Sequence, residues 1–373
     1  PPSRCPRPPP LSTPPPAGMF SIGPALPCGM VASREDSAVG GPGDYRLGLV
    51  GDVMLGRNVD RRRRGDPPEA IWDDVLPWLE NLDGLFGNLE CCLSTRGQQW
   101  TRTRRAFHFR AAPDWAVPAL RTADFDWVSL ANNHVLDYEE VALLDTLDAL
   151  DDAGIAHAGA GRDETDAWEP SVVTAGDLEI GLLACTDNTP EYAASGDDPG
   201  VAWTGMDVED PDDVAPVAEA IETVRRGEPD LLVASVHWGP NMVADPDRSY
   251  VEFGHWLVDR GVDLVHGHSA HNFQGIERYG DGLILHDCGD FVDDYAVHRT
   301  LRNDRGFLFE VVVTQAGDLR GVRLRPTEIG DCAVHRAPAA VAEWSRGRMR
   351  ERSAQFDTAA DFERVDDGLW LPL

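Results

Sequence analysis

The chain has 373 residues and a formal net charge of −31, with 64 Asp and Glu against 33 Lys and Arg. Every one of the basic residues is Arg. A surface this acidic repels nucleic acid and anionic membranes, so we exclude both as expected partners. A Lys-free acidic surface is typical of proteins that stay soluble in molar salt, where the Debye length is only about 3 Å. The composition therefore predicts a halophilic protein that unfolds when salt is removed.

The seven cysteines include no Cys-x-x-Cys pair. This excludes a disulfide framework and a zinc ribbon, and it indicates a reducing compartment. The vicinal Cys91 and Cys92 can be interpreted as a redox or metal site or, as we favour, as small residues that fill a strand end. No apolar run reaches the length of a transmembrane helix and no signal peptide is recognisable, so no integral membrane segment is predicted. We expect a cytoplasmic protein, with a peripheral position at the membrane as the alternative.

Composition divides the chain into three segments. Residues 1–43 hold 12 of the 28 prolines, cannot bury a core and are predicted to be disordered. Met30 lies inside this segment, and we take it as a candidate true start of translation, which would leave residues 1–29 untranslated. One folded domain is predicted over 44–337, followed by a peripheral tail over 338–373 that is rich in Arg and Asp.

Apolar runs and helical periodicity give the order of the elements. Asp137, with Glu140 three residues on, has the pattern of a capping box for a helix that ends at Gly154. Other helices are predicted at 71–82, 115–122 and 250–261. Strands that alternate with helices predict an α/β layered fold. The predicted strands are 47–50, 85–90, 127–131, 178–185, 231–236, 262–265, 283–286, 307–313 and 322–325.

Five of these strands end in polar side chains. In sheets that are covered on both faces, sites gather at the carboxyl ends of the strands. A single polar residue at a strand end is weak evidence for a functional site, but five such strand ends in one chain predict one shared site. The five termini are Asp52, Glu90, Asn133 with His134, His237, and the histidine cluster 266–271.

Carboxylate, amide and imidazole side chains of this kind suit Mn, Fe, Zn or similar divalent ions. The sequence holds enough of them for two ions bridged by one carboxylate. Two ions about 3.5–4 Å apart generate hydroxide near neutral pH and clamp a phosphoryl oxygen. A neighbouring His can then serve the leaving group.

Several sequence blocks together identify a family. They are similar to the poly-gamma-glutamate capsule biosynthesis (CapA-like) family, within the calcineurin-like metallophosphatase superfamily. The resemblance covers roughly residues 45–325 in the family's order, and it implies a four-layer α/β/β/α sandwich with its site above the strands' carboxyl ends. The blocks are GDVMLGR (51–57), GNLE (87–90), SLANNHVLDY (129–138), VHWG (236–239), GHSAHNFQGIE (267–277) and GDFVDDY (289–295).

The resemblance implies a role for each polar terminus. Glu90 stands where the superfamily has its bridging Asp, and His134 matches the His that contacts phosphate or protonates the leaving group. Water held by the metals would attack phosphorus. As catalytic residues we therefore take His134 and Asp52, together with Arg57, whose charge could neutralise phosphate. The implied metal ligands are Asp52, Glu90, Asn133, His237, His268 and His271.

The chain departs from the superfamily pattern at two places. Met54 stands where the superfamily usually has a His, which removes one ligand from the first metal. The closing motif is spaced Gly-His-x-x-His, and Ser269 stands where the CapA-like group often has a further His. Four other histidines, His108, His255, His266 and His286, we interpret as structural. The run Arg61 to Arg64 either meets an anionic substrate or, as we favour, forms a solvated turn that balances nearby acids.

These observations leave three functions open. The first is a metal-dependent phosphoester hydrolase that acts on a phosphoester or a polyglutamate-related substrate, with possible capsule-synthesis partners. The second is a non-catalytic assembly or binding subunit of a polyglutamate synthesis or export system, with a reduced metal site, which Met54 favours slightly. The third is a glutamate ligase, which ranks last because the chain has no G-x-x-x-x-G-K-[ST] loop for ATP.

Overall fold

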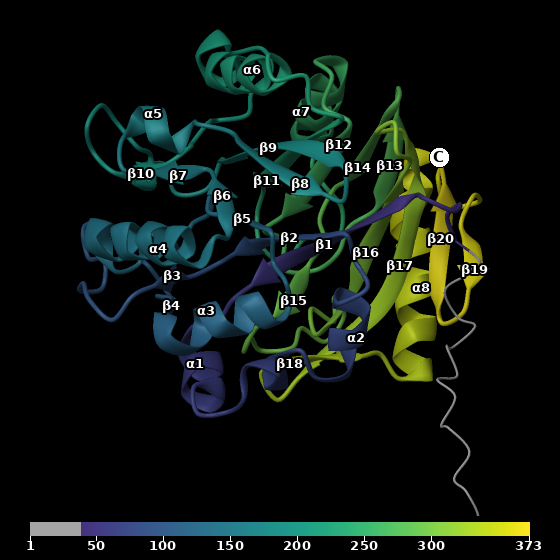
Figure 1. The fold of residues 1–373 in the computed structure, drawn as a ribbon, viewed down its shortest axis with the longest axis horizontal. Coiled ribbons are helices and arrows are strands. Elements are labelled where there is room, and N and C mark those ends of the chain that lie inside the picture. Colours follow the sequence, from purple (N-terminus) through teal and green to yellow (C-terminus); the bar gives the residue numbers. More distant parts are fainter. Residues whose placement is uncertain (1–38) are drawn as a thin grey trace, which may run out of the picture. The chain divides into compact units, whose positions relative to one another are not determined.

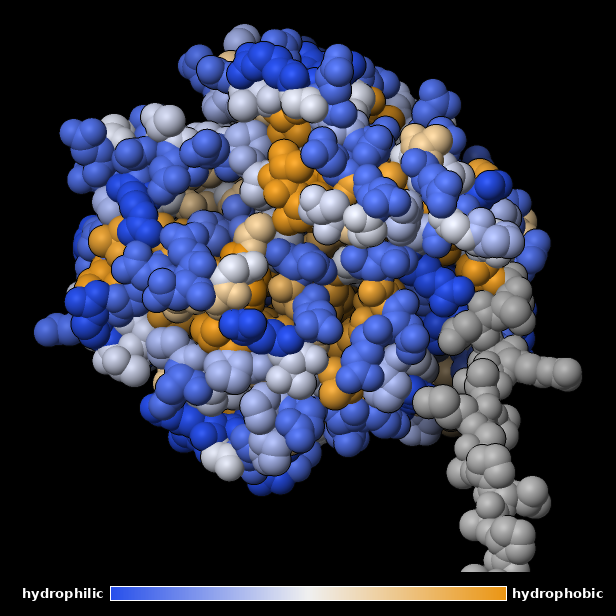
Figure 2. Space-filling view, in the orientation of Figure 1, coloured by the Kyte–Doolittle hydropathy of each residue, from blue (hydrophilic) through white to orange (hydrophobic). Residues whose placement is uncertain are grey.

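The computed structural model describes residues 39–373. The predicted disorder of 1–43 falls almost entirely outside the described residues. Within those residues, no helix has the length and hydropathy needed to cross a membrane. The face shown in Figure 2 is mostly hydrophilic, in keeping with a chain in which 26% of residues are charged.

Two mixed sheets form the centre of the fold. In the larger sheet β1, β2, β5 and β6 are parallel, and β16, β17 and β20 continue it in antiparallel fashion. Its order is β19 (Glu363–Val365), β20 (Gly368–Pro372), β17 (Leu319–Gly330), β16 (Arg305–Val313), β1 (Tyr45–Val53), β2 (Gly84–Leu89), β5 (Trp127–Ser129) and β6 (Ala156–Ala158), with β15 (Asp290–Val292) paired to β1 and β18 (Ala333–Arg336) to β17.

The smaller sheet supplies the second half of the site. Its central strands β9, β11, β12 and β14 are parallel. Two short pairs lie outside both sheets, β3 (Cys92–Leu93) with β4 (Arg110–Ala111) and β7 (Ala160–Gly161) with β10 (Gly200–Val201). The order of the smaller sheet is β13 (Ile276–Tyr279), β14 (Gly282–Leu285), β12 (Leu264–His268), β11 (Leu231–His237), β9 (Leu178–Thr186) and β8 (Ser171–Ala175).

Helices cover the outer face of each sheet. Figure 1 shows α6 and α7 on one side of the two sheets and α3 on the other. Where a helix begins or ends, the sequence often gives the reason: α4 stops at Gly154, which has a left-handed φ of 70° that suits glycine. The helices are α1 (Arg57–Arg63), α2 (Leu76–Leu79), α3 (Pro113–Thr122), α4 (Glu139–Ala153), α5 (Glu164–Ala167), α6 (Pro211–Arg225), α7 (Arg248–Asp259) and α8 (Ala339–Ser353).

Three buried apolar clusters hold these four layers together. Along β1, Leu47 and Leu49 belong to the cluster between the sheets, whereas Val50 and Val53 belong to the cluster beneath α3 and α4. A third cluster lies between the smaller sheet and α6 and α7 and includes Phe253. Because successive side chains of a strand point to opposite faces, each central strand is buried on both. The predicted four-layer α/β/β/α sandwich is confirmed.

The nine predicted strands all occur, but the helix predicted at 71–82 is wrong. That segment forms two 3₁₀ turns, Pro68–Ile71 and Asp73–Val75, and the four-residue α2. Asp73 has a φ of 40°, which interrupts a regular helix, and Pro77 is tolerated only in the first turn of the helix that follows. The apolar residues of the segment are nevertheless buried, which is why its pattern resembled a helix.

Residues 338–373 form α8 and the hairpin of β19 and β20. Strand β20 pairs with β17, and Met349 of α8 and Leu371 of β20 lie fully buried in the cluster between the sheets. The domain boundaries at 44 and 337 remain predictions.

Candidate metal centre

The carboxyl ends of strands from both sheets meet at one edge of the sandwich. Asp52 lies near the end of β1, and His237 and His268 are the last residues of β11 and β12. The two sheets are linked at this point by His266, whose Nε2 lies 2.9 Å from the carbonyl oxygen of Val50. All three strand ends are buried. Polar residues that are far apart in the sequence therefore reach one place.

Two groups of buried candidate ligands share Asp52. Within each group, one ligand atom per residue lies within 4.8 Å of the others. Asp52 Oδ1 lies 3.7 Å from Nδ1 of His268, and Asp52 Oδ2 lies 3.2 Å from Nδ1 of His271. The partners of Asp52 are His237 and His268 in the first set, the histidine group, and Glu90, His271 and Asp290 in the second, the carboxylate group.

Backbone pairing explains why Asp290 joins Asp52. Strand β15 runs parallel to β1 with Asp52 opposite Asp290, and the amide N–H of Asp52 donates to the carbonyl of Gly289 at 2.9 Å. The two backbones approach so closely at Gly51 that a Cβ there would lie 1.7 Å from the Gly289 oxygen. Glycine at 51 is what permits this approach, and the carboxylate group depends on it.

Two asparagines orient Asp52. Nδ2 of Asn88 donates to Asp52 Oδ1 at 2.8 Å, and Nδ2 of Asn132 donates to Asn88 Oδ1 at 3.0 Å. The following residue, Asn133, has a buried side-chain oxygen without a hydrogen-bond partner among the described residues. Asn132 therefore supports the site through Asn88, and the role of Asn133 as a metal ligand stays a prediction.

His134 is held by a carboxylate and an aromatic ring. Its Nδ1 lies 2.5 Å from Oδ2 of Asp137, its ring stacks on Phe109 at 3.7 Å between centroids, and its Nε2 lies 3.9 Å from Glu90. The capping role predicted for Asp137 is wrong. Helix α4 is preceded by Tyr138 without a side-chain cap, because the Asp137 carboxylate instead accepts from the amide of Phe109 and faces His134.

The donor set fits divalent cations. Buried oxygens of Glu90, Asn133 and Asp290 lack hydrogen-bond partners among the described residues. Burial raises the pKa of Glu90 and of Asp290 well above the ordinary values, and the charge of Asp52 raises that of Glu90 further. Burial lowers the pKa of His237 to about 3, which keeps this imidazole neutral, as a metal ligand must be. Crowded carboxylates and unpaired oxygens of this kind are stabilised by a cation at their centre.

We expect metal to bind more tightly as the pH rises. In the metal-free protein the pKa values of Glu90 and Asp290 are raised by burial, and that of His271 is raised because the carboxylates of Asp290 and Glu90 outweigh its burial. Each group must lose its proton to bind a metal ion, so binding releases protons. Titration of metal-stripped protein with Mn²⁺ at about pH 6, 7 and 8 measures this effect, and an affinity independent of pH would contradict it.

The same shifts give the sign of the pH dependence of stability. A group whose pKa is raised on folding contributes stability below its unfolded pKa, and this contribution is lost as the pH rises through the folded value. The loss begins above 4.5 for Glu90 and above 6.5 for His271. Buried histidines with a lowered pKa, such as His237, contribute in the opposite sense, but only below their unfolded value of 6.5. Metal-free protein should therefore melt at lower temperature as the pH rises above about 7, and added Mn²⁺ should reverse the loss.

Met54 and the histidines interpreted as structural make contacts outside the two ligand groups. Met54 is buried, and its sulfur accepts from the amide of Gly56 at 3.1 Å. His266 bonds between the sheets, and His286 and His255 both contact Glu277. His108 lies against a carbonyl of the loop before β4.

Arg57 lies at the outer side of the site. It forms an ion pair with Asp294 at 3.3 Å, and its guanidinium packs over the rings of Phe109 and Tyr295. Tyr295 in turn donates from its hydroxyl to Glu90 at 2.9 Å. Arg57 is thus separated from the candidate ligands by one layer of aromatic rings.

Three residues of the site were missed from the sequence. Asp290 lies in one of the family blocks, but it begins β15, and only the register of that strand against β1 brings it to Asp52. Asn88 and Asp137 gave no signal of a role in the site, because they act only through contacts with Asp52 and His134 that form on folding.

Comparison with known proteins identifies the family. The model of the family described as "Bacterial capsule synthesis protein PGA_cap" matches residues 46–295. The chain belongs to this capsule synthesis family. The resemblance to CapA-like proteins predicted from the motifs is confirmed.

Similar curated proteins extend the comparison. A "Probable polyglutamine synthesis accessory protein" of Mycobacterium tuberculosis is 33% identical over 365 residues, covering 85% of this chain and 93% of the relative. The "Capsule biosynthesis protein CapA" of Bacillus anthracis is 28% identical over 254 residues, covering 68% of this chain and 60% of the relative. A hypothetical protein of Thermus thermophilus has a solved structure that superposes with a TM-score of 0.45 at 17% identity, over 79% of this chain and 100% of that one.

Proposed function

We propose that this capsule synthesis protein is a metal-dependent phosphoester hydrolase with two divalent ions. The observation that carries the proposal is that Asp52 belongs to two adjacent groups of buried ligands. This supports Asp52 as the residue that two ions would share, whereas the family resemblance implies Glu90 for that role. Imidazole and carboxylate ligands suit Mn, Fe or Zn. Divalent ions at such a centre polarise a phosphoryl oxygen and lower the pKa of water. The candidate ligands are Asp52, Glu90, Asn133, His237, His268, His271 and Asp290.

The residues around the ligands supply the remaining chemistry. Because Asp137 faces Nδ1 of His134, the proton of the neutral imidazole sits on Nδ1, and Nε2 points toward the side of Glu90. In this tautomer Nε2 accepts a proton from water, and the imidazolium so formed, which Asp137 stabilises, can pass that proton from Nε2 to a leaving group. Burial lowers the pKa of His134, which favours release of this proton. Phe109 covers the imidazole ring and limits the access of water to it.

The test is the hydrolysis of p-nitrophenyl phosphate and of its bis-ester by the full chain loaded with Mn²⁺. We expect turnover, and we expect His134→Gln to lower kcat by about 10²–10⁴-fold while the bound metal is retained. His157→Gln is the matched control, because His157 also pairs with an aspartate, Asp151, at 3.2 Å but lies on β6, away from the ligands.

A second function is favoured by one observation. The sulfur of Met54 accepts a backbone N–H and leaves the first metal one ligand short of the superfamily pattern. A curated relative is also named as an accessory protein of polyglutamine synthesis. A non-catalytic subunit that binds partners in such a system would have these properties. Protein that binds fewer than two ions and hydrolyses neither ester would support this alternative and refute the hydrolase.

A further inference from the structure

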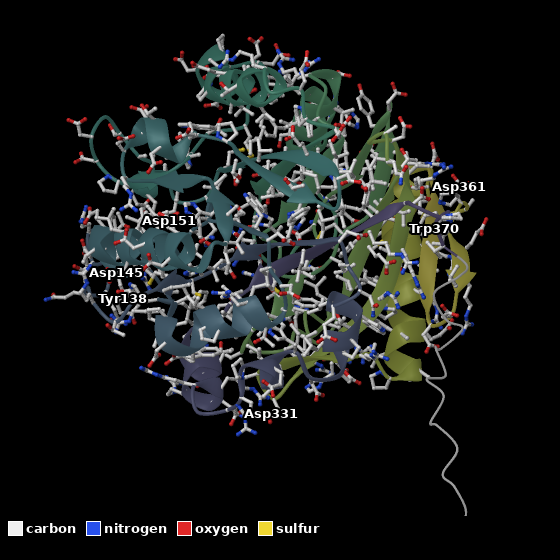
Figure 3. The ribbon with its side chains drawn as sticks, in the orientation of Figure 1. Tyr138, Asp145, Asp151, Asp331, Asp361 and Trp370 are labelled. Atoms are coloured by element: carbon white, nitrogen blue, oxygen red, sulfur yellow. The ribbon has the colours of Figure 1, made fainter. Side chains whose placement is uncertain are left out.

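Arg105 reaches the metal centre from the loop between β3 and β4, which lies against the start of α4 (Figures 1 and 3). Its side chain is only 11% exposed, and arginine is rarely this buried unless its charge is paired. Nη1 donates to Oγ1 of Thr189 at 2.5 Å, and Nη2 donates to the backbone carbonyl of Asn133. One guanidinium therefore joins segments of the chain that are far apart in the sequence.

The guanidinium of Arg105 also lies beside the carboxylate of Asp137. Nη2 is 3.8 Å from Oδ1 of Asp137, and the same oxygen accepts from the hydroxyl of Tyr192 at 3.1 Å. Asp137 is fully buried, and a buried carboxylate is costly without a compensating charge, which Arg105 supplies. Because Oδ1 faces Arg105 and Tyr192, the other oxygen, Oδ2, faces His134.

The backbone contact of Arg105 fixes the segment that carries Asn133. Arg105 holds the carbonyl of Asn133, whose buried side-chain oxygen has no hydrogen-bond partner among the described residues. On either side of Asn133, the amide of His134 donates to Oδ1 of Asn132 at 3.0 Å, and Nδ2 of Asn132 donates to the carbonyl of Leu89 at 2.9 Å. These contacts together set the direction in which the Asn133 side chain leaves the backbone.

Arg105 is not placed to bind a substrate itself. Two of its nitrogens donate to the protein, and its Cζ lies over the ring of Tyr192, 4.8 Å from the centroid. An arginine that binds an anionic ligand instead presents its planar fork of donors to that ligand. The contacts of Arg105 therefore act on the site through Asn133 and Asp137.

Other contacts hold the loop in place without reaching the site. The hydroxyl of Thr103 donates to Glu191 at 2.5 Å, and Arg102 forms ion pairs with Glu139 and Glu140 at the start of α4. The position of the loop thus does not depend on Arg105 alone. Substitution of Arg105 consequently tests the site more than the path of the loop.

We propose that Arg105 is a positioning residue of the metal centre. It aligns Asn133 as a metal ligand, and it turns the carboxylate of Asp137 toward His134. The first effect concerns metal binding alone and needs no enzymatic activity. The second effect rests on the proposed function, because it is measured as turnover.

Titration of metal-stripped full-chain protein with Mn²⁺ tests the first effect. We expect Arg105→Gln to weaken Mn²⁺ binding by about 10-fold, because loss of a residue that orients a ligand costs about 10–100-fold in affinity. Asn133→Ala should weaken it at least as much. In the Asn133→Ala protein, Arg105→Gln should then cost less than about twofold, because the ligand that Arg105 aligns is gone. A merely structural role for Arg105 would make the two losses multiply.

Arg102→Gln is the matched control for the Mn²⁺ titration. Arg102 belongs to the same loop, but its side chain is 51% exposed and pairs with glutamates of α4. Its substitution should change the Mn²⁺ affinity by less than about twofold. Unchanged affinity in Arg105→Gln or in Asn133→Ala, losses that multiply, or equal weakening by Arg102→Gln would each overturn the proposal.

A second variant covers a failure of Arg105→Gln to fold, which urea unfolding detects. Arg105→Lys keeps the positive charge beside Asp137, but an ammonium group lacks the planar fork that reaches Thr189 and Asn133 together. We expect Arg105→Lys to weaken Mn²⁺ binding by about threefold or more, and again by less than about twofold in the Asn133→Ala protein. Wild-type affinity in Arg105→Lys would show that the fork does not align Asn133.

Turnover of p-nitrophenyl phosphate at saturating Mn²⁺ tests the second effect. Arg105→Gln should lower kcat by about 10-fold and change KM by less than about twofold, because Arg105 does not contact the substrate. In the His134→Gln protein the same substitution should change kcat by less than about twofold. A rise in KM without a fall in kcat would contradict this role. A wild-type protein without turnover would refute the hydrolase and leave the Mn²⁺ result standing.

Discussion

Substitution of Asp52 by asparagine is expected to remove metal from both ligand groups at once. Asparagine has the same shape and can still accept from Asn88, so the fold should persist. It lacks the negative charge that a bridging ligand brings to two cations. Metal analysis of the purified variant should find less than about half an ion per chain, and phosphoester turnover should fall on the order of 10³-fold or more, because ions at such a centre supply several kcal/mol of transition-state stabilisation.

Variants that touch one group alone sharpen this prediction. His268→Gln affects only the histidine group and Asp290→Asn only the carboxylate group, so each should leave about one ion bound. Asp151→Asn is a control for the loss of a carboxylate, since Asp151 lies on α4 at the surface (Figure 3). If Asp52→Asn loses no more metal than either single-group variant, Asp52 is not shared and the two-metal proposal fails.

The sequence was sufficient for the layers of the fold because the central strands are buried on both faces. A short apolar run such as 231–236 indicates a strand that is buried on both faces. The polar residue that ends such a run marks the edge of the sheet where the site lies. The conformation of segment 71–82 could not be predicted in this way. Its apolar spacing fits a helix, but the left-handed backbone of Asp73 and the tertiary packing of Trp72 decide its conformation.

A site residue could be predicted where its position at the end of a strand is enough to place it. It could not be predicted where its place depends on a contact that forms only on folding. Glu90 and His237 each end a strand, and that position alone placed them near Asp52. Asp137 has a helix-capping pattern in the sequence, and only the folded backbone turns its carboxylate toward His134. Asp290 depends on the register between β15 and β1, which no local pattern encodes.

That register makes Gly51 the most sensitive glycine near the site. Gly51→Ala is expected to destabilise the protein by about 3 kcal/mol or more and to abolish metal binding by the carboxylate group. The added methyl group would lie 1.7 Å from the carbonyl oxygen of Gly289, and a backbone atom cannot rotate away as a side chain can. Strand β15 would have to move, and Asp290 would move with it away from Asp52.

Gly347→Ala is the matched control for the loss of stability expected from Gly51→Ala. Gly347 lies inside α8, and a Cβ there would meet nothing within 4 Å. The substitution should therefore stabilise the protein by up to about 1 kcal/mol, through helix propensity alone. Urea unfolding of both variants at constant salt, with metal analysis alongside, separates the two cases. If Gly51→Ala unfolds at the wild-type urea concentration and keeps its metal, β15 does not set the position of Asp290, and the carboxylate group must be assembled by the loop around His271 instead.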